Sequence, residues 1–302
     1  ALILTDPGRM PSSVSGNSAT EKAALQQRLS ALAQAVGGIV VDVGSDARVA
    51  ALNAQADANP ACPYAKELVA AAIKDIVDRY RAAHPGQLRS VVLVGDDSVI
   101  PFFRYPDPAL LGPEQDYVPP VDRTSSSEAS LRMNYVLGQD EYGASVVLAN
   151  GVTKLPVPDL PVGRLVETAA DMSAFIDGFL ALNGGVIPTP TSSLVTGYDF
   201  LADASDAIRE ELQAGIGTGA GTRHDSLITA YDVSPLDSRS WTATQLKQQL
   251  ATRHDLIFLG AHFSADSALA ADFSTTITTA DLANIDLANA IVFSIGCHSG
   301  YN

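Results

Sequence analysis

Two residues near the carboxyl-terminal end of the chain, His262 and Cys297, have types that could act together as a base and a nucleophile. Each follows a short apolar run: residues 256–259 (Leu-Ile-Phe-Leu) precede the histidine, and residues 290–293 (Ala-Ile-Val-Phe) precede the cysteine. An imidazole beside a thiol can take its proton, and the thiolate is the attacking species. The pair therefore predicts covalent chemistry by a cysteine.

The two apolar runs are expected to be the strands that bring these side chains together. Both are too short for a helix, and unbroken apolar runs of this length are typical of buried strands in a parallel sheet. If the strands are adjacent and point the same way, His262 and Cys297 leave the sheet at its carboxyl edge, where open α/β sheets bind their ligands. Gly296 and Gly300 flank the cysteine and leave its backbone accessible.

Structural roles for these residues are the alternative. A single cysteine after an apolar strand is more often a buried thiol than a nucleophile, and the conjunction of the two patterns is what favours chemistry. His298 is a rival base, but adjacent side chains of an extended segment diverge, which favours His262. The hypothesis also requires that Cys297 forms no disulfide with the other cysteine, Cys62, because a disulfide would consume the nucleophile.

Further segments of the chain carry a resemblance to a known family. They are residues 273–284 (Phe-Ser-Thr-Thr-Ile-Thr-Thr-Ala-Asp-Leu-Ala-Asn), 297–301 (Cys-His-Ser-Gly-Tyr), 94–101 (Val-Gly-Asp-Asp-Ser-Val-Ile-Pro) and 158–165 (Pro-Asp-Leu-Pro-Val-Gly-Arg-Leu). Together with the two strand motifs, they resemble the gingipains, which belong to a clan of cysteine peptidases with the caspases and legumains. The resemblance implies a caspase-like fold and cysteine peptidase activity.

The resemblance also implies roles for particular residues. Cys297 would be the nucleophile and His262 the general base, while the backbone N–H groups of Cys297 and Phe263 would hold the oxyanion. Asp159 falls where the family has an acid that orients the catalytic histidine, and a surface acid in a polar loop is the alternative reading. The family usually has Gly-His-Gly at the histidine, whereas this chain has Ala261-His262-Phe263.

These observations predict a cysteine endopeptidase that hydrolyses peptide bonds through a Cys-His dyad and a thioester intermediate. The family likeness suggests cleavage after Arg or Lys. Because of the Ala-His-Phe variation, a catalytically inactive peptidase-like domain that binds peptides is the second hypothesis. A small-molecule acyltransferase or hydrolase that uses the same pair is the third.

The proposed chemistry requires no cofactor. A structural calcium ion is an open alternative for one part of the sequence. Asp96 and Asp97 follow an apolar strand at residues 91–94. Two acids in this position could ligate calcium or hold a turn. The turn is favoured, because no regular loop of spaced oxygen ligands follows them.

The amino-acid composition limits the classes of partner that the chain is expected to bind. Nineteen basic against thirty-four acidic residues give a net charge of −15. This excess of acidic residues argues against nucleic acid or anionic membranes as partners, since both bind proteins through clusters of Lys and Arg. No apolar run approaches the roughly 20 residues that cross a membrane. A peptide or protein substrate is the expected partner.

The sequence predicts an α/β protein of two subdomains, with mainly parallel sheets flanked by helices, the second of them caspase-like. An apolar fraction of 46% in 302 residues is ample for packed cores. The proline-rich stretch at residues 187–191 is the best linker, so residues 1–187 and 188–302 are the predicted subdomains. Strands are predicted at residues 1–4, 39–43, 91–94 and 193–199, helices at 20–36, 68–81, 169–182, 204–212 and 240–254, and irregular structure at 102–129.

The ends of the chain suggest a larger protein. The sequence begins without Met or a leader, and it stops at Asn302, five positions after Cys297. We expect a mature or excised fragment whose C-terminal remainder, from the same protein, completes the sheet. The resemblance favours a secreted or cell-surface bacterial protein.

Overall fold

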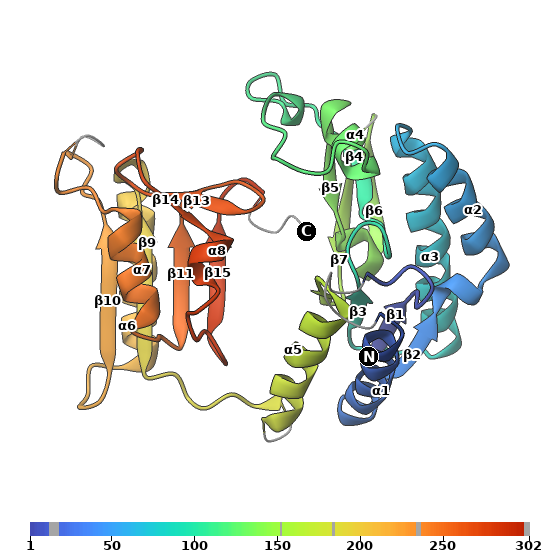
Figure 1. The fold of residues 1–302 in the computed structure, drawn as a ribbon, viewed down its shortest axis with the longest axis horizontal. Helices are drawn as coiled ribbons and strands as arrows, with labels where there is room; N and C mark the ends of the chain where they lie inside the picture. The colour runs from blue at the N-terminus through green and yellow to red at the C-terminus, as the bar shows by residue number, and fades with distance from the viewer. Residues whose placement is uncertain (12–17, 152, 183–184, 234–236, 299–302) are drawn as a thin grey trace. The chain divides into compact units, whose positions relative to one another are not determined.

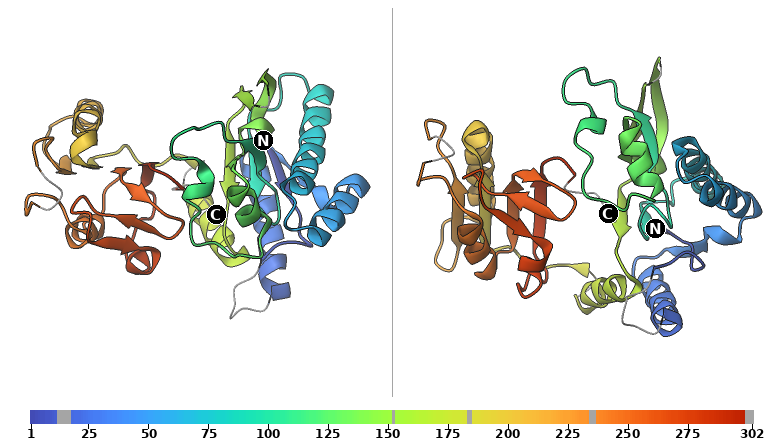
Figure 2. Two further views of the ribbon diagram at one scale, coloured as in Figure 1. Left: turned by 90° about the horizontal axis from the view of Figure 1, so that it is seen from above. Right: turned by 45° about the horizontal axis from the view of Figure 1, so that its top comes forward.

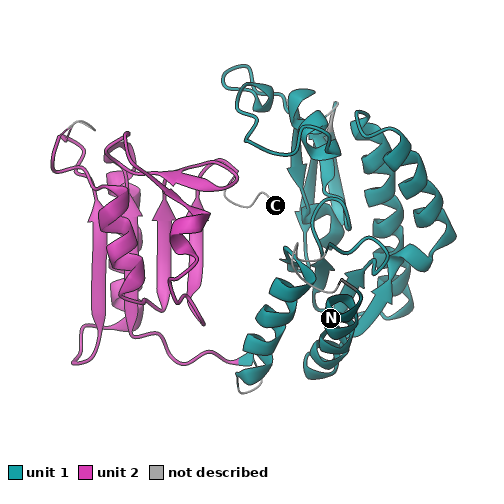
Figure 3. Cartoon of the chain, in the orientation of Figure 1, with its two compact units in different colours: residues 1–185, 302 teal, residues 186–301 magenta. Residues whose placement is uncertain are grey.

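The computed structural model describes all residues except 12–17, 152, 183–184, 234–236 and 299–302. The chain forms two compact units, residues 1–185 and residues 186–301 (Figure 3). Their boundary lies two residues before the division predicted from the linker. No helix of the described residues is long and apolar enough to cross a membrane.

Unit 1 is built on a four-stranded parallel sheet. The strand order is β2-β1-β3-β8, with β1 at Leu2–Thr5, β2 at Ile39–Asp42, β3 at Val91–Val94 and β8 at Val162–Leu165. Strand β1 lies inside the sheet and is buried along its whole length. The predicted α/β class with parallel sheets is confirmed.

The helices of unit 1 cover both faces of this sheet. They are α1 (Ser18–Ala35), α2 (Ala47–Ala58), α3 (Pro63–Ala83) and α5 (Ala169–Ala181). The chain moves from β1 to β2 in one direction, then back across β1 to β3. Because such crossovers are right-handed, the two movements place their helices on opposite faces. Figure 1 shows α1 beside α5, and α2 beside α3.

The segment at residues 102–129, predicted to be irregular, contains regular structure. Strand β4 (Phe103–Pro106) pairs with β5 (Tyr135–Gly138), and α4 (Ser126–Arg132) lies between them in sequence. Contacts between residues that are distant in sequence stabilise this region. Its own residues show no regular spacing of apolar side chains from which the strand and the helix could be predicted. A second antiparallel pair joins β6 (Ala144–Asn150) to β7 (Thr153–Pro158). Short 3-10 turns occupy Val43–Ser45, Glu114–Asp116 and Asp140–Gly143.

Unit 2 repeats the strand order of unit 1. Its parallel sheet has the order β10-β9-β11-β15, with β9 at Ser192–Gly197, β10 at Arg223–Ile228, β11 at Leu256–Gly260 and β15 at Ile291–Ile295. In both units the second strand in sequence lies outside the first, and the third and fourth follow on its other side. The repeated crossover places α6 (Ala202–Ile216) and α7 (Ala243–Ala251) on opposite faces of the sheet (Figure 2).

A small antiparallel sheet follows β11 before the chain reaches β15. It consists of β12 (His262–Phe263), β13 (Ser267–Leu269) and β14 (Thr276–Thr278), and the short helix α8 (Thr279–Leu282) comes next. A 3-10 turn at Asp199–Leu201 follows β9. The core of unit 2 includes Leu194, Tyr198, Trp241, Leu246, Leu250 and Ile257.

Strand β15 differs from the prediction of a buried strand. It is the edge strand, and all five of its residues are exposed. Among them, Phe293 is 52% and Ile295 is 54% exposed. An unbroken apolar run identifies a strand, but whether the strand lies inside a sheet or at its edge depends on its neighbours.

Candidate active site

Strands β11 and β15 are adjacent and parallel, as the sequence predicts. Their register runs from Leu256 opposite Ile291 to Gly260 opposite Ile295. The Ala261 N–H continues the ladder by donating to the Ile295 carbonyl at 3.2 Å. His262 and Cys297 each lie two residues beyond the last paired position. Both candidates therefore emerge at the carboxyl edge of one sheet.

Gly296 allows the two segments to approach closely. A Cβ atom at this position would lie 2.2 Å from the Ala261 carbonyl oxygen and 2.4 Å from the Phe263 ring. No side chain fits in this space. The glycine thus brings the backbone before Cys297 directly against the backbone that flanks His262.

Cys297 is a free, exposed thiol, and so is Cys62. The condition that no disulfide consumes the proposed nucleophile is met. His298 has a positive φ of 57°, so the chain turns immediately after the cysteine. Within the described residues no hydrogen bond joins the Cys297 sulfur to the His262 imidazole. Contacts of this kind often tighten only when substrate binds.

Tyr198 supports His262 in two ways. Its hydroxyl accepts a hydrogen bond from the His262 backbone N–H at 2.9 Å and donates one to the Leu269 carbonyl at 2.5 Å. Its ring lies 5.1 Å from the imidazole, centroid to centroid. Burial raises the pKa of Tyr198 to about 12, so the phenol keeps the proton that it donates. Sequence reasoning missed this residue, although it lies within the predicted strand at residues 193–199 and directly follows β9 in the structure.

Phe263 points away from the imidazole, because successive side chains of a strand face opposite sides. Its ring contacts Gly296 and lines an apolar pocket of about 180 Å³, together with Leu246, Ile277 and Leu282. The bulky residue of the Ala-His-Phe variation is therefore accommodated by packing. The predicted role of its backbone N–H in holding the oxyanion stays a prediction.

Asp159 belongs to unit 1, directly after β7. Its carboxylate accepts hydrogen bonds from the Arg81 guanidinium and from the Ser145 backbone N–H, the latter at 3.0 Å. The bonds from Arg81 are the main reason that the pKa of Asp159 falls to about 2. The role that the sequence predicts for Asp159, orienting His262 of unit 2, stays a prediction.

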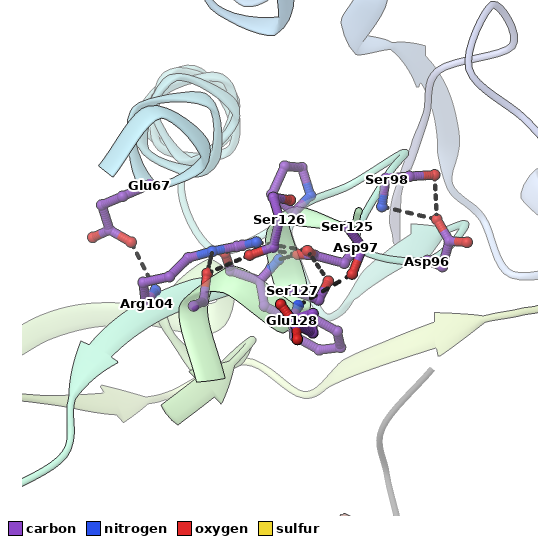
Figure 4. Close-up of polar contacts among 12 residues, drawn as sticks. Glu67, Asp96, Asp97, Ser98, Arg104, Ser125, Ser126, Ser127 and Glu128 are labelled. Atoms are coloured by element: carbon purple, nitrogen blue, oxygen red, sulfur yellow. Dashed lines mark hydrogen bonds and ion pairs between the residues drawn. The ribbon is translucent and has the colours of Figure 1, made fainter. Parts of the chain in front are cut away.

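The carboxylates of Asp96 and Asp97, which follow β3, stabilise the segments next to them through hydrogen bonds. Asp97 is buried and receives two bonds from the Arg104 guanidinium, at 2.8 and 2.6 Å, and one from the Ser127 hydroxyl at 2.6 Å (Figure 4). Burial raises the pKa of Asp97, but these partners outweigh it and hold the value at about 2. Asp96 accepts from the Ser98 N–H and hydroxyl at 2.9 and 2.6 Å. These contacts agree with the turn interpretation.

No metal cluster stands out in the described part of the chain. Its His, Cys, Asp and Glu side chains form no group of three or more that could hold a metal ion. The proposed structural calcium ion therefore has no ligand set assigned to it, and it stays a prediction.

The chain shares its fold with solved peptidases. A family model described as Peptidase family C25 matches residues 23–301. The crystal structure of the Arg specific cysteine proteinase gingipain R has 16% sequence identity and a TM-score of 0.54, and the match covers 99% of this chain and 55% of that chain. A structure titled "Structure of Protease" has 16% identity and a TM-score of 0.55, covering 98% and 51%.

A third structure, the complex of Porphyromonas gingivalis RgpB pro- and mature domains, has 14% identity and a TM-score of 0.54, covering 99% and 56% of the two chains. The chain thus spans about half the length of these three solved chains. At such identities the likeness shows a common fold. No curated protein matches the chain.

Proposed function

The chain belongs to peptidase family C25, and we propose that it is a cysteine endopeptidase with Cys297 as nucleophile and His262 as general base. One observation carries this proposal. The two residues lie equally far beyond the ends of adjacent parallel strands, at one edge of one sheet. Both are exposed, so a peptide can reach them.

The proposed reaction has two halves. His262 takes the proton of the Cys297 thiol, and the thiolate attacks the carbonyl carbon of the peptide bond. The N–H groups of Cys297 and Phe263 stabilise the oxyanion of the tetrahedral intermediate. When this intermediate collapses, the C–N bond breaks, the imidazolium gives its proton to the departing amine, and a thioester remains.

Water completes the cycle. His262 takes a proton from the water as its oxygen attacks the thioester carbon. The C–S bond then breaks and releases the acid, and the imidazolium returns its proton to the Cys297 thiolate. The proposal for Asp159 is that its carboxylate holds the imidazole in the tautomer that this exchange needs.

We propose peptides or proteins with a basic residue before the scissile bond as substrates. The fold neighbour gingipain R is described as Arg specific. The net charge of −15 favours the approach of basic substrates. A secreted or cell-surface location, which the resemblance to gingipains suggests, belongs to the same proposal.

Labelling of the thiol by a peptidyl acyloxymethyl ketone tests the dyad. At neutral pH this probe should modify Cys297 quickly, and Cys62→Ala should label as the unaltered protein does. Cys297→Ala should lose both labelling and hydrolysis of Arg-containing peptides. His262→Ala should slow both by at least about 100-fold, which is the usual contribution of a general base.

The outcomes separate the three hypotheses. Peptide binding without labelling or cleavage would contradict the proposal and favour a binding domain. Fast labelling of Cys297 without cleavage of any member of a peptide library would also contradict it, and would favour acyl transfer on small molecules.

A further inference from the structure

Two exposed phenylalanine rings flank His262. Phe200, in the turn after β9, is 55% exposed, and Phe273, between β13 and β14, is 40% exposed. Their ring centroids lie 5.7 and 5.6 Å from the centroid of the imidazole. Large apolar side chains that gather at the surface often mark a binding site.

The buried ring of Tyr198 forms the floor beneath this group. It lies 5.5 Å from the Phe200 ring and 5.4 Å from the Phe273 ring. It also packs against Trp241, at 5.8 Å. The floor is thus part of the core of unit 2, and the two outer rings stand on a fixed base.

The loop that carries Phe273 is held firmly. Phe273 has a φ of 52°, a region that bulky residues rarely adopt and that persists only where the surroundings enforce it. Asp272 stabilises this backbone conformation, because its carboxylate accepts hydrogen bonds from the backbone N–H groups of Ser274 and Thr275 at 3.1 and 2.9 Å. The Phe273 N–H donates to the Ala270 carbonyl at 3.0 Å. The backbone that carries the ring is therefore in place before any ligand arrives.

The proposed chemistry determines which part of a substrate meets these rings. The imidazolium of His262 must protonate the departing amine, so that nitrogen has to come within about 3 Å of the imidazole. The side chain of the residue that carries this amine is attached one carbon away. It therefore falls within reach of the two rings that lie beside His262.

We propose that Phe200 and Phe273 form a subsite for a large apolar or aromatic side chain on the amine side of the scissile bond. This inference rests on the Cys297–His262 dyad proposed above. An apolar occupant is favoured because the exposed walls of the subsite are two phenyl rings, which gain most from burial against another apolar surface. The preordered backbone at Phe273 lowers the cost of ordering the site when the substrate binds.

Internally quenched peptides test the subsite. They share one sequence up to the scissile bond and differ only in the next residue, which is Phe, Leu, Gly, Asp or Lys. The intact protein should cleave the Phe and Leu peptides with kcat/KM about tenfold or more above the Gly peptide, a range that apolar pockets reach. Phe200→Ala and Phe273→Ala should each reduce this ratio towards one. Phe175→Ala, which removes a 65% exposed ring from unit 1, should leave it unchanged.

A second readout separates binding from folding. A peptidyl chloromethyl ketone has only a chloride ion beyond the reacting carbon, so it should label Cys297 in both variants as fast as in the unaltered protein. Equal cleavage of all five peptides, a preference for Lys, or an equal loss of cleavage and labelling in the variants would each overturn the subsite while leaving the dyad standing. Failure of Cys297 to label in the unaltered protein would remove the dyad and the subsite together.

Discussion

The hydroxyl of Tyr198 holds the backbone of His262, from which it accepts a hydrogen bond at 2.9 Å. The two residues are 64 positions apart in sequence. The same hydroxyl donates to the Leu269 carbonyl, so one phenol connects the end of β9 to two strands of the small sheet. The proposed base therefore has a fixed backbone as well as an aromatic ring, tilted by 40°, against its imidazole.

Tyr198→Phe removes this connection while keeping the ring. We expect unit 2 to lose about 1–2 kcal/mol of stability, since the Leu269 carbonyl and the His262 N–H each lose a partner. Fluorescence of Trp241, the only tryptophan, measures this loss during urea unfolding. Labelling of Cys297 should also slow, because the imidazole is less well fixed. Tyr231→Phe, which alters an 80% exposed tyrosine, is the control, and equal behaviour of the two variants would refute the prediction.

Gly296→Ala should disturb the edge at which the proposed dyad lies. The added methyl group meets the Ala261 carbonyl oxygen at 2.2 Å, so a backbone segment must move. We expect a loss of about 1–3 kcal/mol, typical of overpacking, and a clear loss of Cys297 labelling. Gly215→Ala is a matched control, because its Cβ meets nothing within 4 Å and lies in α6. It should be neutral or stabilising by about 0.5–1 kcal/mol. Similar melting curves for both variants would argue against the predicted clash.

Asp97→Asn should strongly destabilise unit 1. The substitution leaves the Arg104 guanidinium, whose side chain is 1% exposed, without its charged partner. Breaking a buried pair in this way costs about 3–5 kcal/mol. Asp75→Asn breaks an exposed pair with Arg48 and should cost at most about 1 kcal/mol. Urea unfolding followed by circular dichroism compares them, and equal costs would show that burial does not strengthen the dependence on Asp97.

Acid pH should remove the contribution of Asp97. Its pKa is about 2 in the folded protein and 3.8 as the ordinary value, so the carboxylate stabilises the fold above about pH 4. This contribution, of about 2 kcal/mol for such a difference, is lost as the pH falls through 2. The unaltered protein should therefore lose more stability between pH 5 and pH 2 than Asp97→Asn does. Parallel stability curves over that range would contradict this assignment.

Asp159→Asn tests the predicted orienting role of this acid. If the carboxylate fixes the tautomer of His262, its loss should lower the labelling rate of Cys297 by about tenfold or more and change the pH profile of labelling. Arg81→Gln is the matched control, because it removes the ion pair and leaves the carboxylate in place. A loss of the same size in both variants would assign Asp159 a structural role only.

The sequence by itself determined the class of the fold and the strands that carry His262 and Cys297. Three kinds of pattern carry this information: apolar runs, apolar residues at helical spacing, and the positions of glycine and proline. Each is a local property of the sequence that directly reflects the backbone geometry of a strand, a helix or a turn. The resemblance to the gingipains also rests on short local motifs, and the match to the family model agrees with it.

The tertiary structure alone decided which residues surround those two side chains. Tyr198 and Phe200 reach His262 from a different strand end, and the Ser127 hydroxyl reaches the Asp97 carboxylate from 30 positions away. Strand β15 is exposed although its composition is that of a core strand. The physical reason is the same in each case: a side chain's partners and its burial depend on which distant segments pack against it, and that information is absent from any short window of sequence.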